Sequence, residues 1–322
     1  MKPSFLSSLN LEEAIFAALL YSDLFSYPLK DQEIWFWLPK KASFKTVKRT
    51  LNQLVGEGKI KHKDSFYFLD CPQIIARRRK REKISQKKLI LAEKVSKKLG
   101  LLPWVGLVAV SGNLALGAAG EDDDIDLVII TLPGALFRGR LASVLLTEIL
   151  GLRRRPGQKI AADKICLNLF LAANNLKMPT SRQDFYTAHE ALQLLPVAGD
   201  GCFYQQFLLD NNWLANYLPQ AYGQRLNKKP WLKDFVSQSH QKRSGFLEKL
   251  AKVGQQTYSK CHHRFLIKDN SEQLFFHPQD QRKIVLDRFE KNWQKLTTSW
   301  ERDPGSIRIT LDKIALDDYY KE

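Results

Sequence analysis

The chain has 322 residues, of which 44% are hydrophobic and 26% are charged. This composition is typical of a globular protein and excludes collagen-like or low-complexity sequence, and the length predicts two or three domains. Fifty Lys and Arg residues against 34 Asp and Glu residues give a formal net charge of +16. Such an excess points to a polyanionic partner, either nucleic acid or an anionic membrane surface.

The sequence indicates an intracellular chain without a membrane segment. The N-terminus reaches Glu12 and Glu13 before any long apolar stretch, which disfavours a signal peptide. The most apolar candidate, around residues 141–146, is far shorter than the ~20 residues that span a bilayer. No C-x-x-C pair occurs among the four cysteines, Cys71, Cys166, Cys202 and Cys261. We therefore expect a cytoplasmic protein with no membrane partner.

The first seventy residues predict three helices and a hairpin. Apolar residues recur at helical spacing after Asn10, which is a good N-cap, and a further helix follows Ser43. Two short strands flank a turn at Asp64 and Ser65. The helices are expected at residues 11–21, 31–38 and 44–55, and the strands at residues 59–63 and 66–69.

Three helices followed by a hairpin resemble a winged-helix domain, here residues 1–71. The resemblance implies that the third helix is a recognition helix, which enters a nucleic-acid groove. Its exposed side chains are expected to be Lys45, Lys48, Arg49, Asn52 and Gln53. The alternative is a winged helix that docks a protein partner, but the basic and amide side chains favour nucleic acid.

The segment from residue 74 to residue 99 is strongly basic. Its apolar residues recur at helical spacing, so we expect a helix with one docked face. Five consecutive cations at residues 77–81 repel one another unless an anion lies near. We therefore predict that Arg77, Arg78 and Arg79 contact nucleic-acid phosphates; the alternative is a solvated connector helix. The segment contains two acidic residues, Glu82 and Glu93. It contains eleven basic residues, namely Arg77, Arg78, Arg79, Lys80, Arg81, Lys83, Lys87, Lys88, Lys94, Lys97 and Lys98.

Two acidic residues open a predicted strand in the middle of the chain. Asp124 and Asp126 lie two residues apart before the apolar run at residues 127–130, so both carboxylates are expected to project from one face of the strand. Their mutual repulsion is offset if they share a divalent cation. Mg²⁺ in proteins is commonly held by one or two carboxylates together with phosphate oxygens. The overlapping pair of Asp122 and Asp124 has the same spacing.

A turn precedes this acidic pair. A predicted strand at residues 105–110 ends at Ser111-Gly112-Asn113, and a short helical stretch follows. Backbone N–H groups of such a turn form an anion site, and Gly112 and Gly117 allow a phosphate chain to approach the backbone. Together the turn and the carboxylates predict a site for a metal-bound triphosphate.

This pattern resembles the nucleotidyltransferase superfamily that includes DNA polymerase beta, in which a strand, Gly-Ser, about ten residues and Asp-x-Asp follow one another. Here ten residues separate Asn113 from Asp124. The resemblance implies that Asp124 and Asp126 bind Mg²⁺ or Mn²⁺. It also implies that the nucleotide phosphates are bound by the turn and helix residues Ser111, Gly112, Asn113 and Gly117.

Two departures from the family pattern concern catalysis. Asn113 replaces the family's serine, and its amide can still donate a hydrogen bond to phosphate. Active relatives carry a third carboxylate on a later strand, here expected at residues 165–171. Asn168 occupies the expected position, and Asp163 just before the strand is an alternative. A missing third carboxylate leaves nucleotide binding intact but removes a metal ligand or base from catalysis.

Beyond Ala172 the sequence predicts helices only, at residues 182–195, 201–217, 245–259 and 280–296. Their recurrent aromatic residues are expected in a core rather than on a base-stacking surface. His189 is expected to be structural. Cys261, His262 and His263 lack the partner spacing of a metal site.

These inferences give an α+β protein with a winged-helix domain (1–71), a basic helix with a nucleotidyltransferase domain built on a small mixed sheet (72–176), and a helical domain (177–322). The expected function is a metal-dependent nucleotidyltransferase that moves an NMP from an NTP to a hydroxyl acceptor linked to nucleic acid. The alternative is a catalytically degenerate, NTP-binding and nucleic-acid-binding regulator. Asn168 favours the alternative.

Overall fold

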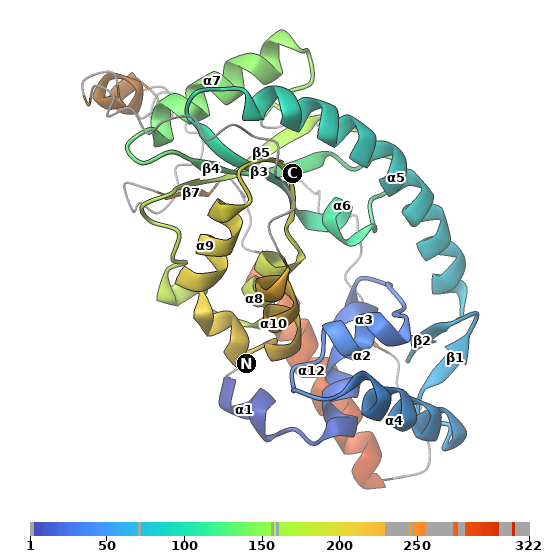
Figure 1. Ribbon diagram of the computed structural model, residues 1–322. Coiled ribbons are helices and arrows are strands. Elements are labelled where there is room, and N and C mark those ends of the chain that lie inside the picture. The colour runs from blue at the N-terminus through green and yellow to red at the C-terminus, as the bar shows by residue number, and fades with distance from the viewer. Residues whose placement is uncertain are drawn as a thin grey trace.

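The computed structural model is an α+β protein with a mixed five-stranded sheet (Figure 1). The helices are α1 (Pro3–Ser8), α2 (Leu11–Leu24), α3 (Asp31–Phe36), α4 (Phe44–Gly56), α5 (Gln73–Gly100), α6 (Gly112–Leu116), α7 (Leu136–Ile149), α8 (Phe185–Gln193), α9 (Cys202–Asp210), α10 (Pro219–Asn227) and α12 (Gln281–Arg302). The strands are β1 (Lys61–Lys63), β2 (Phe66–Phe68), β3 (Val105–Val110), β4 (Ile125–Thr131), β5 (Ile165–Ala172), β6 (Leu195–Gly199) and β7 (Gln273–Phe275).

The structure describes residues 3–69, 72–155, 158, 161–228, 245, 248–254, 273–275, 281–302 and 311–312. Of the helix expected at residues 245–259, the stretch 248–254 is helical. The cysteine and histidines at 261–263 lie outside the described residues. Among the described helices, none combines the length and the apolar character that crossing a membrane requires.

The central sheet has the strand order β6-β3-β4-β5-β7. Strands β4 and β5 are parallel, and the other neighbouring pairs are antiparallel. The expectation that no strand follows Ala172 is wrong, because both edge strands come from the C-terminal part of the chain. Leu195, expected at the end of a helix, begins the edge strand β6, and Pro196 follows it in this strand, where a missing N–H is tolerated.

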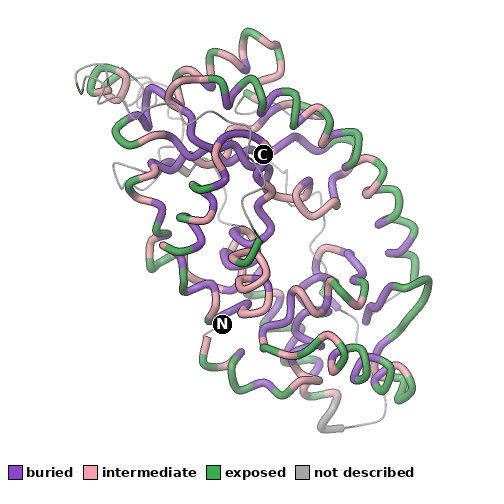
Figure 2. Tube along the Cα trace, viewed as in Figure 1, coloured by how far each residue is buried: buried purple, intermediate pink, exposed green. Residues whose placement is uncertain are grey.

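The two faces of the sheet are buried in different cores. Val108, Val110 and Ile129 pack in one core with apolar residues of α5 and α7. Ala109 and Val128, on the opposite face, belong to a second core that includes residues of α8 and α9 and extends into the N-terminal helices. Buried and exposed positions alternate along the α5 trace in Figure 2. The predicted core role of the aromatic residues is confirmed for Phe185, Tyr204, Phe207, Trp213 and Tyr217, all of which are buried.

The N-terminal part contains the expected three helices and hairpin. Asn10 caps α2 in a capping box: its side chain accepts from the Glu13 N–H, and the Glu13 carboxylate accepts from the Asn10 N–H. Helix α4 buries Val47 and Leu51 against α2 and α3. Helix α12 packs along α2, so the two ends of the described chain share one core.

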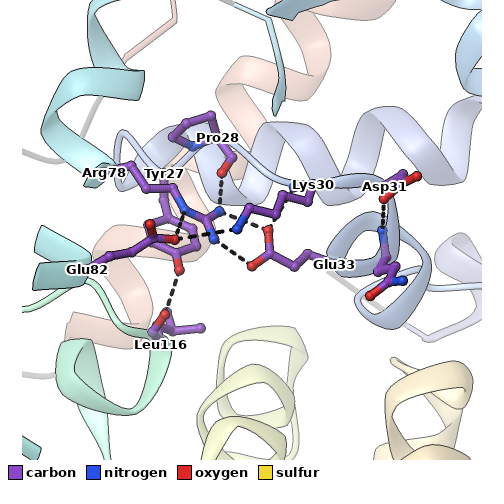
Figure 3. A network of polar contacts seen from close by, with 9 residues as sticks. Tyr27, Pro28, Lys30, Asp31, Glu33, Arg78, Glu82 and Leu116 are labelled. Carbon is purple, nitrogen blue, oxygen red and sulfur yellow. Dashed lines mark hydrogen bonds and ion pairs between the residues drawn. The ribbon is translucent and has the colours of Figure 1, made fainter. Parts of the chain in front are cut away.

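Helix α5 connects the hairpin to the central sheet. It has 28 residues, which corresponds to a length of about 42 Å. At its N-terminal end Arg78 is only 2% exposed. Figure 3 shows its guanidinium group between the carboxylates of Glu33 and Glu82, with the Pro28 carbonyl as a further acceptor. The guanidinium group also lies 4.0 Å from the ring centroid of Tyr27.

The predicted phosphate contact of Arg78 is therefore wrong, because its guanidinium group is buried and paired within the protein. Acceptor groups of the protein itself reduce the repulsion among the five cations at residues 77–81, so this repulsion does not have to be offset by a polyanion alone. Arg79, which is exposed, pairs with Asp64 at 3.1 Å, and Arg81 is also buried. Arg77 is exposed, and its contact with phosphates stays a prediction.

Replacement of Arg78 tests its structural role. Arg78→Ala removes the buried cation from between the Glu33 and Glu82 carboxylates, which keep Lys30 as a partner, and removes the stacking on Tyr27. We expect a loss of about 2–4 kcal/mol in the free energy of unfolding. This loss is smaller than for a fully buried ion pair, because both carboxylates are partly exposed. The exposed neighbour variant Arg77→Ala should change it by less than about 0.5 kcal/mol. Urea denaturation measures both, and equal effects would contradict the assignment.

Candidate functional site

Asp124 and Asp126 lie together at the start of β4. One carboxylate oxygen of each and the Sγ atom of Cys166 all lie within 4.8 Å of one another. The two-residue spacing along an extended chain accounts for the shared face of the two carboxylates. Asp124 is buried, whereas Asp126 and Cys166 are half-buried. The overlapping Asp122 is exposed and does not belong to this cluster.

Cys166, rather than Asn168, pairs with Asp126 in the parallel register of β4 and β5. Leu127 pairs with Leu167 and Val128 with Leu169, so Asn168 is the extra residue of a bulge. The register of the two strands thus places the Cys166 thiol, rather than the Asn168 amide, opposite Asp126.

Asp163 is held by Lys88 rather than by the aspartate cluster. The buried ammonium group of Lys88 donates to the Asp163 carboxylate at 2.7 Å, and to the carbonyls of Asp123 at 2.7 Å and Glu121 at 3.0 Å. Ser85, one turn earlier on α5, accepts from the Ala119 N–H. Helix α5 therefore fixes the loop that leads into β4.

The turn before α6 lies against the second aspartate. The Ser111 N–H donates to the Asp126 carbonyl at 2.9 Å. Gly112 has φ = +61°, and a Cβ atom at this position would lie 2.8 Å from the Asp126 carboxylate oxygen Oδ2. Glycine is therefore required both by the backbone conformation and by the contact with the carboxylate. Gly117, at φ = +74°, ends α6 in the left-handed conformation.

Asn113 is engaged within the loop. Its Nδ2 atom donates to the Asp123 carboxylate at 3.2 Å, and the same carboxylate accepts from the Gly120 N–H at 2.9 Å. One of its two amide N–H groups is therefore used to close the loop.

The electrostatics of the cluster favour added positive charge. Burial, and then the neighbouring charge of Asp126, raise the pKa of the Asp124 carboxyl, and Arg154 opposes this rise. Burial likewise raises the pKa of Asp126. The Arg154 Nη1 atom lies 2.6 Å from Asp124 Oδ2. The other carboxylate oxygen of Asp124 and the hydroxyl of Ser111 are buried and have no hydrogen-bond partner among the residues that the structure describes. Buried polar atoms in this state fit an unfilled ligand position.

Glu190 on α8 is a further carboxyl group, and its pKa is affected by the charge of Asp126. Burial raises its pKa, a hydrogen bond from Gln193 lowers it, and the charge of Asp126 raises it, with the result at about 7. Helix α8 contacts α6, the helix after the turn.

A cavity separates this site from the N-terminal helices. It is lined by Tyr21, Trp37, Asn113 and His189, among others, and its volume of about 30 Å³ gives room for about two water molecules. His189 stacks on Tyr21 with ring centroids 3.7 Å apart. Burial lowers the pKa of His189, so the ring is neutral. This packing agrees with the expected structural role of His189.

The structure does not bring all the predicted site residues together. The turn and the aspartates lie at the central sheet, whereas α4 lies at the opposite end of α5 (Figure 1). The four predicted binding residues of α4 are all exposed, namely Lys45, Lys48, Arg49 and Asn52.

Sequence reasoning missed Cys166, Arg154 and Lys88 as residues of the site. Cys166 carried a signal, because it belongs to the strand predicted next to the aspartates. Arg154 lies in a loop without periodicity, and Lys88 is one of many lysines on α5.

Comparison with known proteins gives no match: no protein-family model fits the sequence, and neither a curated protein nor a solved structure is significantly similar to the chain.

Two glycine variants test how the turn positions Asp126. Gly112→Ala should destabilise the protein and weaken divalent-cation binding, because the added methyl group displaces the Asp126 carboxylate. Gly134→Ala is the matched control, since Gly134 has φ = +65° and open space around its Cβ position. Both variants should lose about 1–2 kcal/mol of unfolding free energy to the left-handed conformation, but only Gly112→Ala should also lose cation affinity in calorimetry. Equal cation affinities would contradict the assignment.

Proposed function

We propose that the protein is a metal-dependent nucleotidyltransferase, which binds an NTP with Mg²⁺ or Mn²⁺ and moves its NMP to a hydroxyl acceptor. The observation that carries the proposal is the cluster at β4, where two carboxylates converge and one oxygen of Asp124 is buried without a partner. A carboxylate pair of this kind suits a divalent cation that also carries phosphate oxygens. The Ser111-Gly112-Asn113 turn lies beside it, as a triphosphate site requires.

Each group has a defined task in this proposal. Asp124 and Asp126 hold the cation, and Arg154 orients Asp124. When bound, the cation offsets phosphate charge and polarises the reacting phosphate. The acceptor oxygen forms a bond to the α-phosphorus, the bond from that phosphorus to the bridging oxygen breaks, and pyrophosphate leaves. The proton of the acceptor passes to a carboxylate base, and Glu190, whose pKa of about 7 suits proton transfer near neutral pH, is one candidate.

One observation favours a second candidate function, an NTP-binding regulator with little or no transferase activity. Cys166 stands opposite Asp126, and Asp163 is paired with Lys88. The metal-binding cluster found among the described residues thus contains two carboxylates rather than three. Such a site binds one cation well and a second poorly.

We further propose that the N-terminal helices and hairpin are a winged helix that binds nucleic acid. Helix α4 exposes Lys45, Arg49 and Asn52 while its opposite face is buried. The three residues of β1 are exposed at the position of a wing. Docking of a protein partner on the same face is the alternative.

Calorimetry with an NTP and Mg²⁺ tests the metal site. Asp126→Asn removes one charge from the pair and should lower metal-dependent NTP affinity at least tenfold. Asp122→Asn is the matched control, because Asp122 is exposed and outside the cluster, and it should bind as the wild type does. Unchanged binding in Asp126→Asn would overturn both candidate functions.

A turnover assay then separates the two candidates. Labelled NTPs are incubated with Mg²⁺ or Mn²⁺, with and without total RNA. Release of pyrophosphate together with a labelled acceptor supports the transferase. Tight NTP binding without either product supports the regulator.

Salt dependence tests the nucleic-acid proposal. If α4 contacts phosphates, the logarithm of the binding constant should fall linearly with the logarithm of salt concentration, by about 0.7–0.9 per phosphate contact. The double variant Lys45→Ala/Arg49→Ala should flatten the slope by up to about two such contacts. The double variant Lys283→Ala/Lys291→Ala removes the same charge from exposed positions of α12 and should leave the slope unchanged. Equal slopes in both variants would exclude α4 as the contact surface.

A further inference from the structure

We infer that Asp124, Asp126 and Cys166 form a thiolate-containing site that prefers Zn²⁺ or Co²⁺ over Mg²⁺. The inference rests on the proposed function for the role of the ion, but the identity of the ion follows from the ligand atoms. It assigns Cys166 as a metal ligand, a role that neither the sequence pattern nor the two-carboxylate site includes.

The fold places the three ligand atoms around one point. Asp126 and Cys166 are paired across parallel strands, and Asp124 lies two residues before Asp126 on the same face. Zinc binds sulfur and oxygen ligands at about 2.0–2.3 Å. Ligand atoms within 4.8 Å of one another can therefore close on one such ion with small side-chain movements.

The ligand types select the ion. Mg²⁺ requires oxygen ligands in near-octahedral geometry and keeps several waters, and sulfur contributes little to it. Thiolate ligands select softer ions, and zinc accepts sulfur and carboxylate oxygen together. Three protein ligands with an open fourth position is the arrangement of catalytic zinc sites. In this protein the open position would face the Gly112 turn and a phosphate oxygen of the nucleotide.

An independent observation marks the site as a place for a ligand. Asp124 is 4% exposed, and its Oδ1 atom is buried without a partner while Arg154 binds Oδ2. Arg154 thus fixes the carboxylate and leaves one oxygen for the ion, the task of an outer-sphere residue. Two carboxylates, one thiolate, one guanidinium and one dication also sum to zero charge. That neutrality suits a site that is largely removed from water.

Cobalt spectroscopy on the full chain tests the inference. Co²⁺ bound by Cys166 should give a thiolate-to-cobalt charge-transfer band in the near ultraviolet. The band should be lost in Cys166→Ser and kept in Cys202→Ser, which removes the exposed cysteine. Stoichiometric Zn²⁺ should abolish the band, and a large excess of Mg²⁺ should not. Because loss of even an outer-sphere residue weakens metal binding about 10–100-fold, Cys166→Ser should lower Co²⁺ affinity at least tenfold.

The results also separate this inference from the proposed function. Co²⁺ binding without the band, and of equal affinity in wild type and Cys166→Ser, would overturn the inference while the two-carboxylate site stands. Absence of any divalent-cation binding would overturn both. Cys166→Asp is a second variant, chosen because it keeps a ligand at the same position. It should lose the band and reverse the preference towards Mg²⁺ and Mn²⁺; a metal preference unchanged from wild type would contradict the role of the thiol.

Discussion

The repulsion between two neighbouring carboxylates is the constraint on which the account of this protein depends. Asp124 and Asp126 lie together, and burial followed by the charge of Asp126 raises the pKa of the Asp124 carboxyl. Arg154 offsets part of that charge, and the remaining buried oxygen of Asp124 has no partner. A divalent cation would offset the remaining negative charge and would also bind the unpartnered oxygen of Asp124. The adjacent Gly112 carries no side chain, which lets the Asp126 carboxylate lie close to the backbone of the turn.

The scaffold around this pair is held by buried cations that lie on one helix. Lys88 and Ser85 of α5 fix the loop before β4, and Arg78 joins the other end of α5 to the N-terminal helices. Tyr27, which stacks on Arg78, donates a hydrogen bond to the Leu116 carbonyl at the end of α6 (Figure 3). The N-terminal helices and the segment that follows the Ser111-Gly112-Asn113 turn are therefore linked through two residues, Arg78 and Tyr27. Part of the basic character of α5 serves this scaffold, and the exposed remainder is available to a polyanion.

Sequence reasoning identified local features well and long-range pairings poorly. Helix caps, the turn at Gly112 and the aspartate spacing are local, so the N-terminal elements and the site's first half could be predicted. The register between β4 and β5 depends on a bulge at Asn168, which no local pattern reveals, and the cysteine was therefore overlooked. Strands β6 and β7 are short edge strands whose pairing is decided by the sheet. Burial of Arg78 and Lys88 needed acceptors from distant segments, which composition cannot indicate.

Anomalous diffraction can locate a cation bound at the two aspartates. Crystals of the full chain grown with an NTP and Mn²⁺ should show one strong anomalous peak between the carboxylates of Asp124 and Asp126, with nucleotide phosphate density beside the turn at residues 111–113. Mn²⁺ suits this measurement because it scatters anomalously and binds carboxylate and phosphate oxygens. A peak elsewhere, or nucleotide bound away from the aspartates with no ion between them, would contradict the account.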